Sequence, residues 1–172
     1  MQKTSLLAAC RLVVGVGVVA LLMHTWLLMG LVVPVTVAGS SMAPTLEEPQ
    51  RLLVDRTAYA FREPRRWEIV VFRSPVDARL LCVKRVVGLP GETVSLEGGD
   101  VLINGRRIAK PLDVEYDIRY GDRTGSRDGW RLGPQEYFVL GDNAAISDDS
   151  RSWPADPGLN AKLLLGRPLG VR

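Results

Sequence analysis

Arg79-Leu-Leu-Cys-Val-Lys-Arg-Val-Val87 is the longest strand candidate in this chain of 172 residues. β-branched and other apolar side chains dominate it, and the turn residues Gly88-Leu-Pro-Gly91 end it, as is typical of a β-strand. Lys84 lies within the apolar part, after Val83 and before Val86. Its side chain is either exposed on one face of the strand or buried in apolar surroundings.

Shorter strand patterns lie on both sides of this stretch. The other predicted strands cover residues 51–55, 68–72, 93–96, 101–103, 106–108 and 137–140. Turn residues separate them and no 3.6-residue periodicity appears, so the pattern predicts a mostly β, antiparallel domain. Asn104-Gly105 is typical of a type I′ hairpin. Residues 159–165 fit either a short helix or a strand.

One long apolar run occupies the N-terminal part of the chain. No Asp, Glu, Lys or Arg occurs from Leu12 to Leu46. As a helix rising ~1.5 Å per residue, residues 12–33 would cross a hydrocarbon core of ~30 Å. Thr36-Val37-Ala38 resembles the cleavage site of a secretory signal, but the apolar run is longer than the roughly 7–15 residues of such a signal. We therefore predict an uncleaved transmembrane helix.

The charges that flank this helix predict its orientation. Lys3 and Arg11 precede it, and the first positive charge after it is Arg51. Because positive residues favour the cytoplasmic side, we expect three parts in the chain. These are a cytoplasmic N-terminus (1–11), a transmembrane helix (12–33) and an extracytoplasmic β-rich domain (34–172), with residues 113–130 as a surface excursion.

The composition excludes several kinds of chemistry. The only histidine, His24, lies inside the predicted membrane span, so a Ser-His-Asp arrangement is not available to the β domain. Cys10 and Cys82 lie on opposite sides of that span, which predicts no disulfide, and too few ligands remain for a zinc or iron site. The net charge of +3 is scattered and does not indicate a nucleic-acid partner. We expect no metal and no cofactor.

Two serines lie at the junction between the apolar run and the β domain. Ala38-Gly-Ser-Ser-Met-Ala-Pro-Thr-Leu46 reads either as a juxtamembrane linker or as a stiff turn that presents a nucleophilic hydroxyl. A serine nucleophile without histidine needs another base. Of the lysines in the domain, only Lys84 lies in an apolar strand. Burial there would lower the pKa of its amine and allow it to accept a proton near neutral pH.

A third polar stretch runs from Gly141 to Arg151. It is either a loop whose Asp and Ser side chains bond their own backbone or a support for the lysine. In the second reading Ser147 holds the amine, and Asp149 forms an ion pair with Arg151 that braces the loop.

Together the three stretches resemble the bacterial type I signal peptidases (leader peptidases). The resemblance is carried by Ser41-Met-Ala-Pro-Thr-Leu46, by Val83-Lys-Arg-Val-Val-Gly-Leu-Pro-Gly-Glu92, by Gly141-Asp-Asn143 and by Ser147-Asp-Asp-Ser-Arg151. Their order after an apolar helix matches as well. The resemblance implies a signal-peptidase-like fold and a Ser-Lys dyad. It also implies a membrane-anchored serine endopeptidase that cleaves signal peptides from exported preproteins.

The same resemblance implies a role for individual residues. Ser41 would be the nucleophile and Lys84 the general base, while Ser147 would orient Lys84. Asp149 and Arg151 would be structural supports. The position two residues before the nucleophile, which helps to bind the oxyanion in the family, is Gly39 and has no hydroxyl, so we expect backbone N–H donors only.

Substrate binding follows from the resemblance too. An extended peptide is expected to pair with strand edges beside residues 35–37 and 80–82. The expected walls of its small-residue pockets are Val37, Met42, Leu46, Cys82 and Val83. Cys82 is interpreted as a buried wall residue and not as a second nucleophile.

The implied setting is a single-pass protein of the inner (plasma) membrane, monomeric, with membrane lipid and secretory preproteins as its partners. The chain departs from the family pattern at Trp67-Glu68, where Gly-Asp is usual, and at Ala144, where arginine is common. Two alternatives stay open: a self-processing relative of the Ser-Lys SOS repressor proteases, which would cut near Ala38, and an inactive β module that binds partners.

Overall fold

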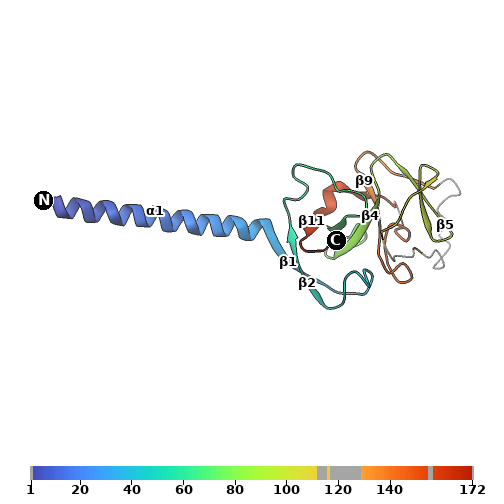
Figure 1. Ribbon diagram of the computed structural model, residues 1–172, viewed down its shortest axis with the longest axis horizontal. Coiled ribbons are helices and arrows are strands. Elements are labelled where there is room, and N and C mark those ends of the chain that lie inside the picture. Colours follow the sequence, from blue (N-terminus) through green and yellow to red (C-terminus); the bar gives the residue numbers. More distant parts are fainter. Residues whose placement is uncertain (1, 112–115, 117–128, 155–156, 172) are drawn as a thin grey trace. The chain divides into compact units, whose positions relative to one another are not determined.

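The computed structural model describes residues 2–111, 116, 129–154 and 157–171, and within its first helix it describes the side chains of residues 13–26, 30 and 31. The chain divides into two compact units, Met1–Val33 and Pro34–Arg172. The first unit is formed by helix α1, Gln2–Leu31 (Figure 1). Side chains along its described part are exposed, from Val13 to Trp26. Among the described residues, no helix combines the length and the apolar character that crossing a membrane requires.

The helix ends two residues earlier than the predicted span. Strand β1 (Val32–Val37) begins directly after Leu31. Its sequence, Val-Val-Pro-Val-Thr-Val, explains the change, because β-branched residues favour strands and the residue before a proline is disfavoured in a helix. The prediction of helix up to residue 33 was therefore wrong at this end.

Two antiparallel sheets form the second unit, so the predicted mostly β class is confirmed. The seven-stranded sheet has the order β1-β2-β11-β3-β4-β9-β10 and the four-stranded sheet the order β7-β6-β5-β8. The larger sheet contains, besides β1, the strands β2 (Gln50–Asp55), β3 (Ile69–Arg73), β4 (Leu81–Gly88), β9 (Glu136–Leu140), β10 (Leu159–Asn160) and β11 (Leu164–Pro168). The smaller one contains β5 (Thr93–Glu97), β6 (Asp100–Ile103), β7 (Arg106–Arg107) and β8 (Trp130–Arg131).

Turn chemistry accounts for several of the connections. Asn104 and Gly105 have φ values of 51° and 76° and connect β6 to β7, which matches the predicted type I′ hairpin. Residues 159–165 contain both predicted alternatives, because β10 is followed by the short 3₁₀ helix η1 (Ala161–Leu163) and by the start of β11. Strands β8 and β10 are only two residues long, too short to produce a recognisable pattern.

The predicted surface excursion, residues 113–130, lies mostly outside the described residues. Of its described part, Tyr116 is fully buried. Its ring stacks on that of Trp67, with centroids 6.3 Å apart and planes 7° apart. Tyr116 also belongs to the core cluster between the two sheets. At this residue, therefore, the segment is anchored in the core and is not on the surface.

Strand β4 lies between β3 and β9 and is covered on both faces. Its side chains alternate between two apolar clusters. Val86 packs with Val70, Phe72 and Val139 in one cluster, whereas Val87 belongs to the other, with Val94 and Phe138 among its members. The same alternation sends the adjacent side chains of Lys84 and Arg85 to opposite faces, and both are 4% exposed.

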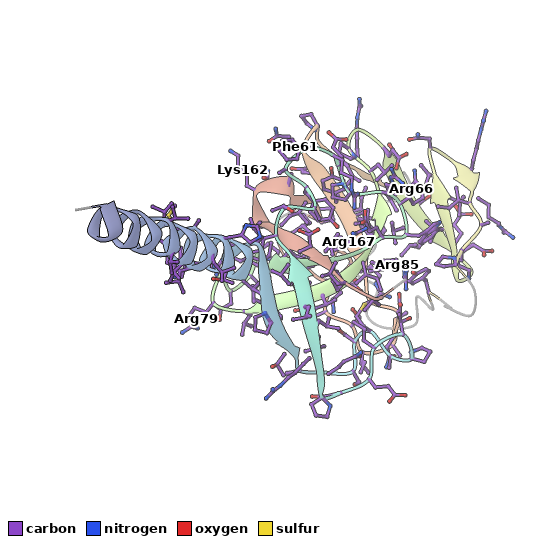
Figure 2. All side chains as sticks on the ribbon, turned by 60° about the vertical axis from the view of Figure 1, so that its left-hand side comes forward. Phe61, Arg66, Arg79, Arg85, Lys162 and Arg167 are labelled. Atoms are coloured by element: carbon purple, nitrogen blue, oxygen red, sulfur yellow. The ribbon has the colours of Figure 1, made fainter. Side chains whose placement is uncertain are left out.

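Arg85 forms a buried ion pair with Asp142. Its guanidinium donates to both carboxylate oxygens of Asp142, with N–O distances of 2.8 and 2.7 Å, and to the carbonyl oxygen of Trp67 at 2.7 Å. Thr45 Oγ1 donates to the same carboxylate at 2.5 Å. Asp142 therefore connects the loop after β1, strand β4 and the end of β9. Arg79, in contrast, lies before β4 on the surface (Figure 2), where its side chain is 89% exposed and pairs with Asp77.

Breaking the buried pair should destabilise the β unit strongly. Asp142→Ala leaves the Arg85 guanidinium buried without its carboxylate, and such changes cost about 3–5 kcal/mol. We expect a correspondingly lower free energy of unfolding in urea. Asp77→Ala, which removes the carboxylate of the exposed pair, is the matched control and should leave the unfolding midpoint nearly unchanged. Equal midpoints for Asp142→Ala and the parent chain would contradict this role.

Candidate active site

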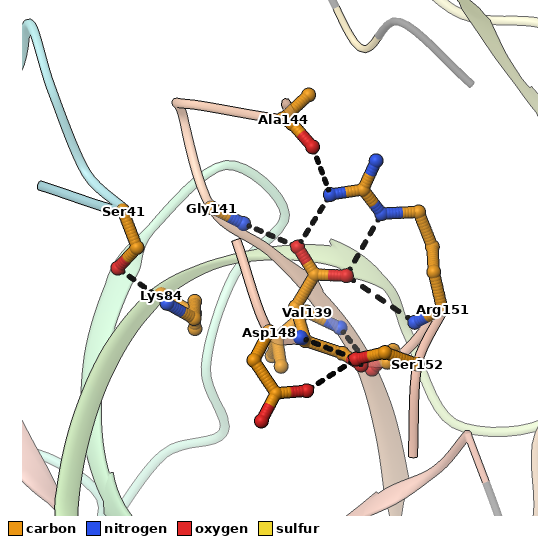
Figure 3. Close-up of polar contacts among 10 residues, drawn as sticks. Ser41, Lys84, Val139, Gly141, Ala144, Asp148, Arg151 and Ser152 are labelled. Atoms are coloured by element: carbon orange, nitrogen blue, oxygen red, sulfur yellow. Dashed lines mark hydrogen bonds and ion pairs between the residues drawn. The ribbon is translucent and has the colours of Figure 1, made fainter. Parts of the chain in front are cut away.

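The structure brings Ser41 and Lys84 into direct contact. Ser41 lies in the loop that follows β1, and Lys84 extends from β4. Lys84 Nζ is 2.5 Å from Ser41 Oγ (Figure 3). The lysine is 4% exposed, whereas the serine is half-buried at the edge of a cavity. A hydroxyl next to a buried amine is the arrangement expected of a nucleophile and its base.

Burial lowers the pKa of the Lys84 amine below its usual range, because the charged form loses hydration that its apolar surroundings do not replace. The carboxylates of Asp149 and Asp148 and the thiol of Cys82 act in the opposite direction, and Arg151 acts with burial. Because the desolvation outweighs the carboxylates, the pKa of the amine is lowered, which is the direction that makes the proton-accepting neutral form more accessible.

A cavity of about 370 Å³ opens beside the two side chains. One wall is β1 and the loop after it, and the opposite wall is the segment 80–84. Besides Ser41 and Lys84, four predicted site residues line it: Val37, Gly39, Cys82 and Val83. Two other predicted wall residues do not. Met42 and Leu46 are 1% and 2% exposed and lie in the interior behind the loop.

The thiol of Cys82 is half-buried on the cavity wall. Burial raises its pKa above the usual range for a thiol, although Lys84 and a hydrogen bond with Ser74 act in the other direction. A protonated thiol is a weak nucleophile. The raised pKa is the opposite of the shift that activates a thiol as a nucleophile.

Ser147 is near the site but not bonded to the lysine. Its Oγ is buried and has no hydrogen-bond partner in the described part of the chain. It packs over Gly141, where an added Cβ would come within 2.2 Å of Ser147 Oγ and 2.5 Å of the Ser41 carbonyl oxygen. Only glycine at position 141 lets the Ser41 loop and Ser147 approach this closely.

Asp149 and Arg151 form an ion pair within the loop after β9. Asp149 is fully buried and accepts hydrogen bonds from Arg151 Nε and Nη2, each at 2.8 Å, and from the Gly141 N–H at 3.0 Å. Arg151 Nη2 also donates to the Ala144 carbonyl at 3.0 Å (Figure 3). The pair thus fixes both ends of the turn that carries Gly141 and Ser147.

Residues without a predicted role hold the nucleophile loop in place. The Asn143 N–H donates to the Ser41 carbonyl at 3.0 Å, and the Asn143 side chain donates to the Ser40 carbonyl at 3.2 Å. Thr45 is held by Asp142, the partner of Arg85. The motifs that carried the resemblance contain the residues Thr45, Arg85, Asp142 and Asn143. Their pattern did not indicate that Thr45 would bond to Asp142, which is 97 residues away in the sequence.

Several known proteins are similar to this chain in sequence. The family model described as "Signal peptidase, peptidase S26" matches residues 10–167. Signal peptidase I of Leptolyngbya laminosa is 38% identical over 144 residues, which are 76% of this chain and 64% of that protein. Signal peptidase I V of Bacillus subtilis (strain 168) is 34% identical over 146 residues, 78% of this chain and 84% of that protein.

A crystal structure of a signal peptidase I from Enterococcus faecalis V583 has 28% sequence identity and a TM-score of 0.48, and the match covers 62% of this chain and 97% of that one. The chain spans slightly less than two thirds of the length of the Leptolyngbya protein. Because the family model extends over nearly the whole sequence, the chain belongs to the signal peptidase family, peptidase S26.

Proposed function

We propose that this chain is a membrane-anchored Ser-Lys endopeptidase that removes signal peptides from exported preproteins. The observation that carries the proposal is the 2.5 Å contact between Ser41 Oγ and the buried Lys84 amine at the edge of a cavity. The only histidine of the sequence is in the N-terminal helix, so the β unit has no imidazole base. Membership of the signal peptidase family supports the class of substrate.

The reaction is acyl transfer in two steps. Neutral Lys84 accepts the proton of the Ser41 hydroxyl while Oγ attacks the carbonyl carbon of the scissile bond. The ammonium then gives this proton to the departing amine, and the C–N bond breaks to leave an ester on Ser41. Lys84, neutral again, takes a proton from a water molecule, which attacks the ester and releases the new carboxyl end. Ser41 regains its proton from Lys84.

The negative oxygen of each tetrahedral intermediate needs hydrogen-bond donors. The Ser41 N–H lies at the reacting centre, and Gly39, with φ +100°, brings the backbone to the cavity without a side chain. We infer that backbone N–H groups alone hold the oxyanion here. One such donor contributes ~3 kcal/mol of transition-state stabilisation.

Substrate binding would use the two walls of the cavity. Strand β1 is at one edge of the seven-stranded sheet, and an extended peptide can add to such an edge through backbone hydrogen bonds. The opposite wall, segment 80–83, would hold the other side of the peptide. Side chains that point into a cavity of about 370 Å³, which also holds the peptide backbone, have to be small.

The loop after β9 would position the base. The Asp149–Arg151 pair holds this loop rigid, and Ser147 offers a buried hydroxyl without a partner in the described residues. If this hydroxyl oxygen accepts a hydrogen bond from one N–H of the neutral amine, the lone pair of the amine stays free to face Ser41. We assign Ser147, Asp149 and Arg151 to positioning and not to bond breaking.

The uncharged run from Leu12 supports the proposed anchor. In this proposal the helix holds the monomeric enzyme in the inner (plasma) membrane with the β unit outside the cytoplasm. We expect the full chain to stay with the membrane fraction after washing at alkaline pH, and a chain beginning at Pro34 to appear in the supernatant. Release of the full chain by the same wash would contradict the anchor.

Ser41→Ala and Lys84→Ala should each abolish cleavage of a secretory precursor, because one removes the nucleophile and the other its base. Ser40→Ala and Lys162→Ala are the matched controls, since both side chains are exposed. The measurement is kcat/KM on a purified precursor in detergent, with unfolding curves that show all four variants folded. Substantial cleavage by either the Ser41 or the Lys84 variant would refute the proposed dyad.

The rate should depend on pH through Lys84. Its pKa is lowered from 10.5, so the neutral amine already predominates at pH values where an ordinary lysine is charged. We expect kcat/KM to rise with pH along a single acid limb whose midpoint lies below 10.5. A rate that is independent of pH from mildly acidic to alkaline conditions would exclude a lysine base.

A further inference from the structure

Asp148 places a carboxylate on the cavity wall that the proposed reaction does not use. The residue lies between Ser147 and Asp149 and is exposed. Among the described residues, its hydrogen-bond partner is the hydroxyl of Ser152, which donates to the carboxylate (Figure 3). Among the described residues Asp148 forms no ion pair, in contrast to Asp149, whose charge is balanced by Arg151.

The charge of Asp148 is also unbalanced within the cavity. Among the described residues that line it, only Lys84 and Asp148 have side chains that are ionised in water at neutral pH. Lys84 has to be neutral when it acts as a base. The working cavity therefore contains one negative charge.

The field of this carboxylate reaches the groups on the opposite wall. Asp148 raises the pKa of both the Lys84 amine and the Cys82 thiol, the direction expected of a nearby negative charge. Apolar side chains line the same cavity, with Ile146 in the same loop as Asp148, Leu80 just before β4 and Leu81 at its start. A bound peptide would displace water from this region and strengthen electrostatic interactions within it.

We propose that Asp148 is a specificity-determining residue, which favours preproteins with a basic side chain beside the cleaved bond and disfavours those with an acidic one. The inference rests on the proposed function, because it assumes that the cavity binds a peptide. A Lys or Arg side chain can extend along the apolar wall and place its charge near the carboxylate. A Glu or Asp side chain at the same position would meet a like charge.

The test is a set of precursors that differ by one residue. Lys, Gln or Glu is placed in turn at each position beside the cut, except at the two positions that hold small residues. With the parent chain we expect, at one position or more, kcat/KM for Lys about fivefold above that for Glu, as for an ion pair open to solvent. The ratio should fall as salt is added, because ions screen the interaction.

Asp148→Asn should bring this ratio close to one without slowing cleavage of the Gln precursor, because loss of the negative charge lowers the pKa of the Lys84 amine further. Asparagine keeps an acceptor for Ser152, so the loop retains its hydrogen bond. Asp148→Glu should restore the preference. Glu97→Gln removes one exposed negative charge from β5, away from the cavity, and should keep the parent ratio.

A Lys-to-Glu ratio that is the same in Asp148→Asn and the parent chain would overturn the inference. An equal loss on all precursors would also overturn it, because it would show a role in holding the loop. Both results leave the proposed function intact. Failure of the parent chain to cleave any precursor would instead refute the proposed function.

Discussion

The 2.5 Å contact between Ser41 Oγ and Lys84 Nζ joins a loop and a strand that are 43 residues apart in sequence. Its chemical value depends on the environment of the amine. In water a lysine near pH 7 carries a proton and has no lone pair to offer. On β4, between β3 and β9, the side chain is almost fully removed from water. The two cores of the β unit therefore serve the chemistry as well as stability, because they keep this environment apolar.

Because side chains alternate between the two faces of a β-strand, β4 places two adjacent basic residues in different electrostatic environments. Arg85, one residue after Lys84, is equally buried, but Asp142 compensates its charge with two hydrogen bonds. Lys84 has no such close carboxylate, and burial lowers the pKa of its amine instead. Asp142 also receives the hydroxyl of Thr45, so the ion pair on one face of the strand fixes the loop that delivers Ser41 to the other face.

Much of the fold follows from short-range patterns. Runs of apolar and β-branched residues predicted strands β2, β3, β4 and β9 of the larger sheet, and Asn104-Gly105 predicted the hairpin of the smaller sheet, because strand and turn preferences are set by neighbouring residues. The end of α1 was missed because Val32 and Val33 are apolar enough for a membrane helix, while Pro34 disfavours a helical conformation at the residue before it. Tyr116 was placed on the surface since its neighbours are polar, and only the tertiary stacking with Trp67 shows that it is buried.

The site was predicted in part. Elimination left two adjacent serines as candidate nucleophiles and Lys84 as the candidate base, and the resemblance then selected Ser41 and Lys84. Met42 and Leu46 were placed on the cavity wall by resemblance, although the turn around Pro44 directs them inward. The roles of Arg85, Asp142 and Asn143 could not be predicted, since a polar residue gives no sign of the partner it will meet after folding. The role that we propose for Asp148 could not be predicted for the same reason.

The most direct test of the account is the titration of Lys84 itself. The chain has only four lysines, Lys3, Lys84, Lys110 and Lys162, so isotope-labelled lysine gives few NMR signals, and Lys84→Met assigns the relevant one. The account predicts that the signal of the Lys84 side chain changes with pH around a midpoint below the usual 10.5 of a lysine. A midpoint at or above 10.5 would contradict it, because the amine would then be charged when Ser41 has to lose its proton.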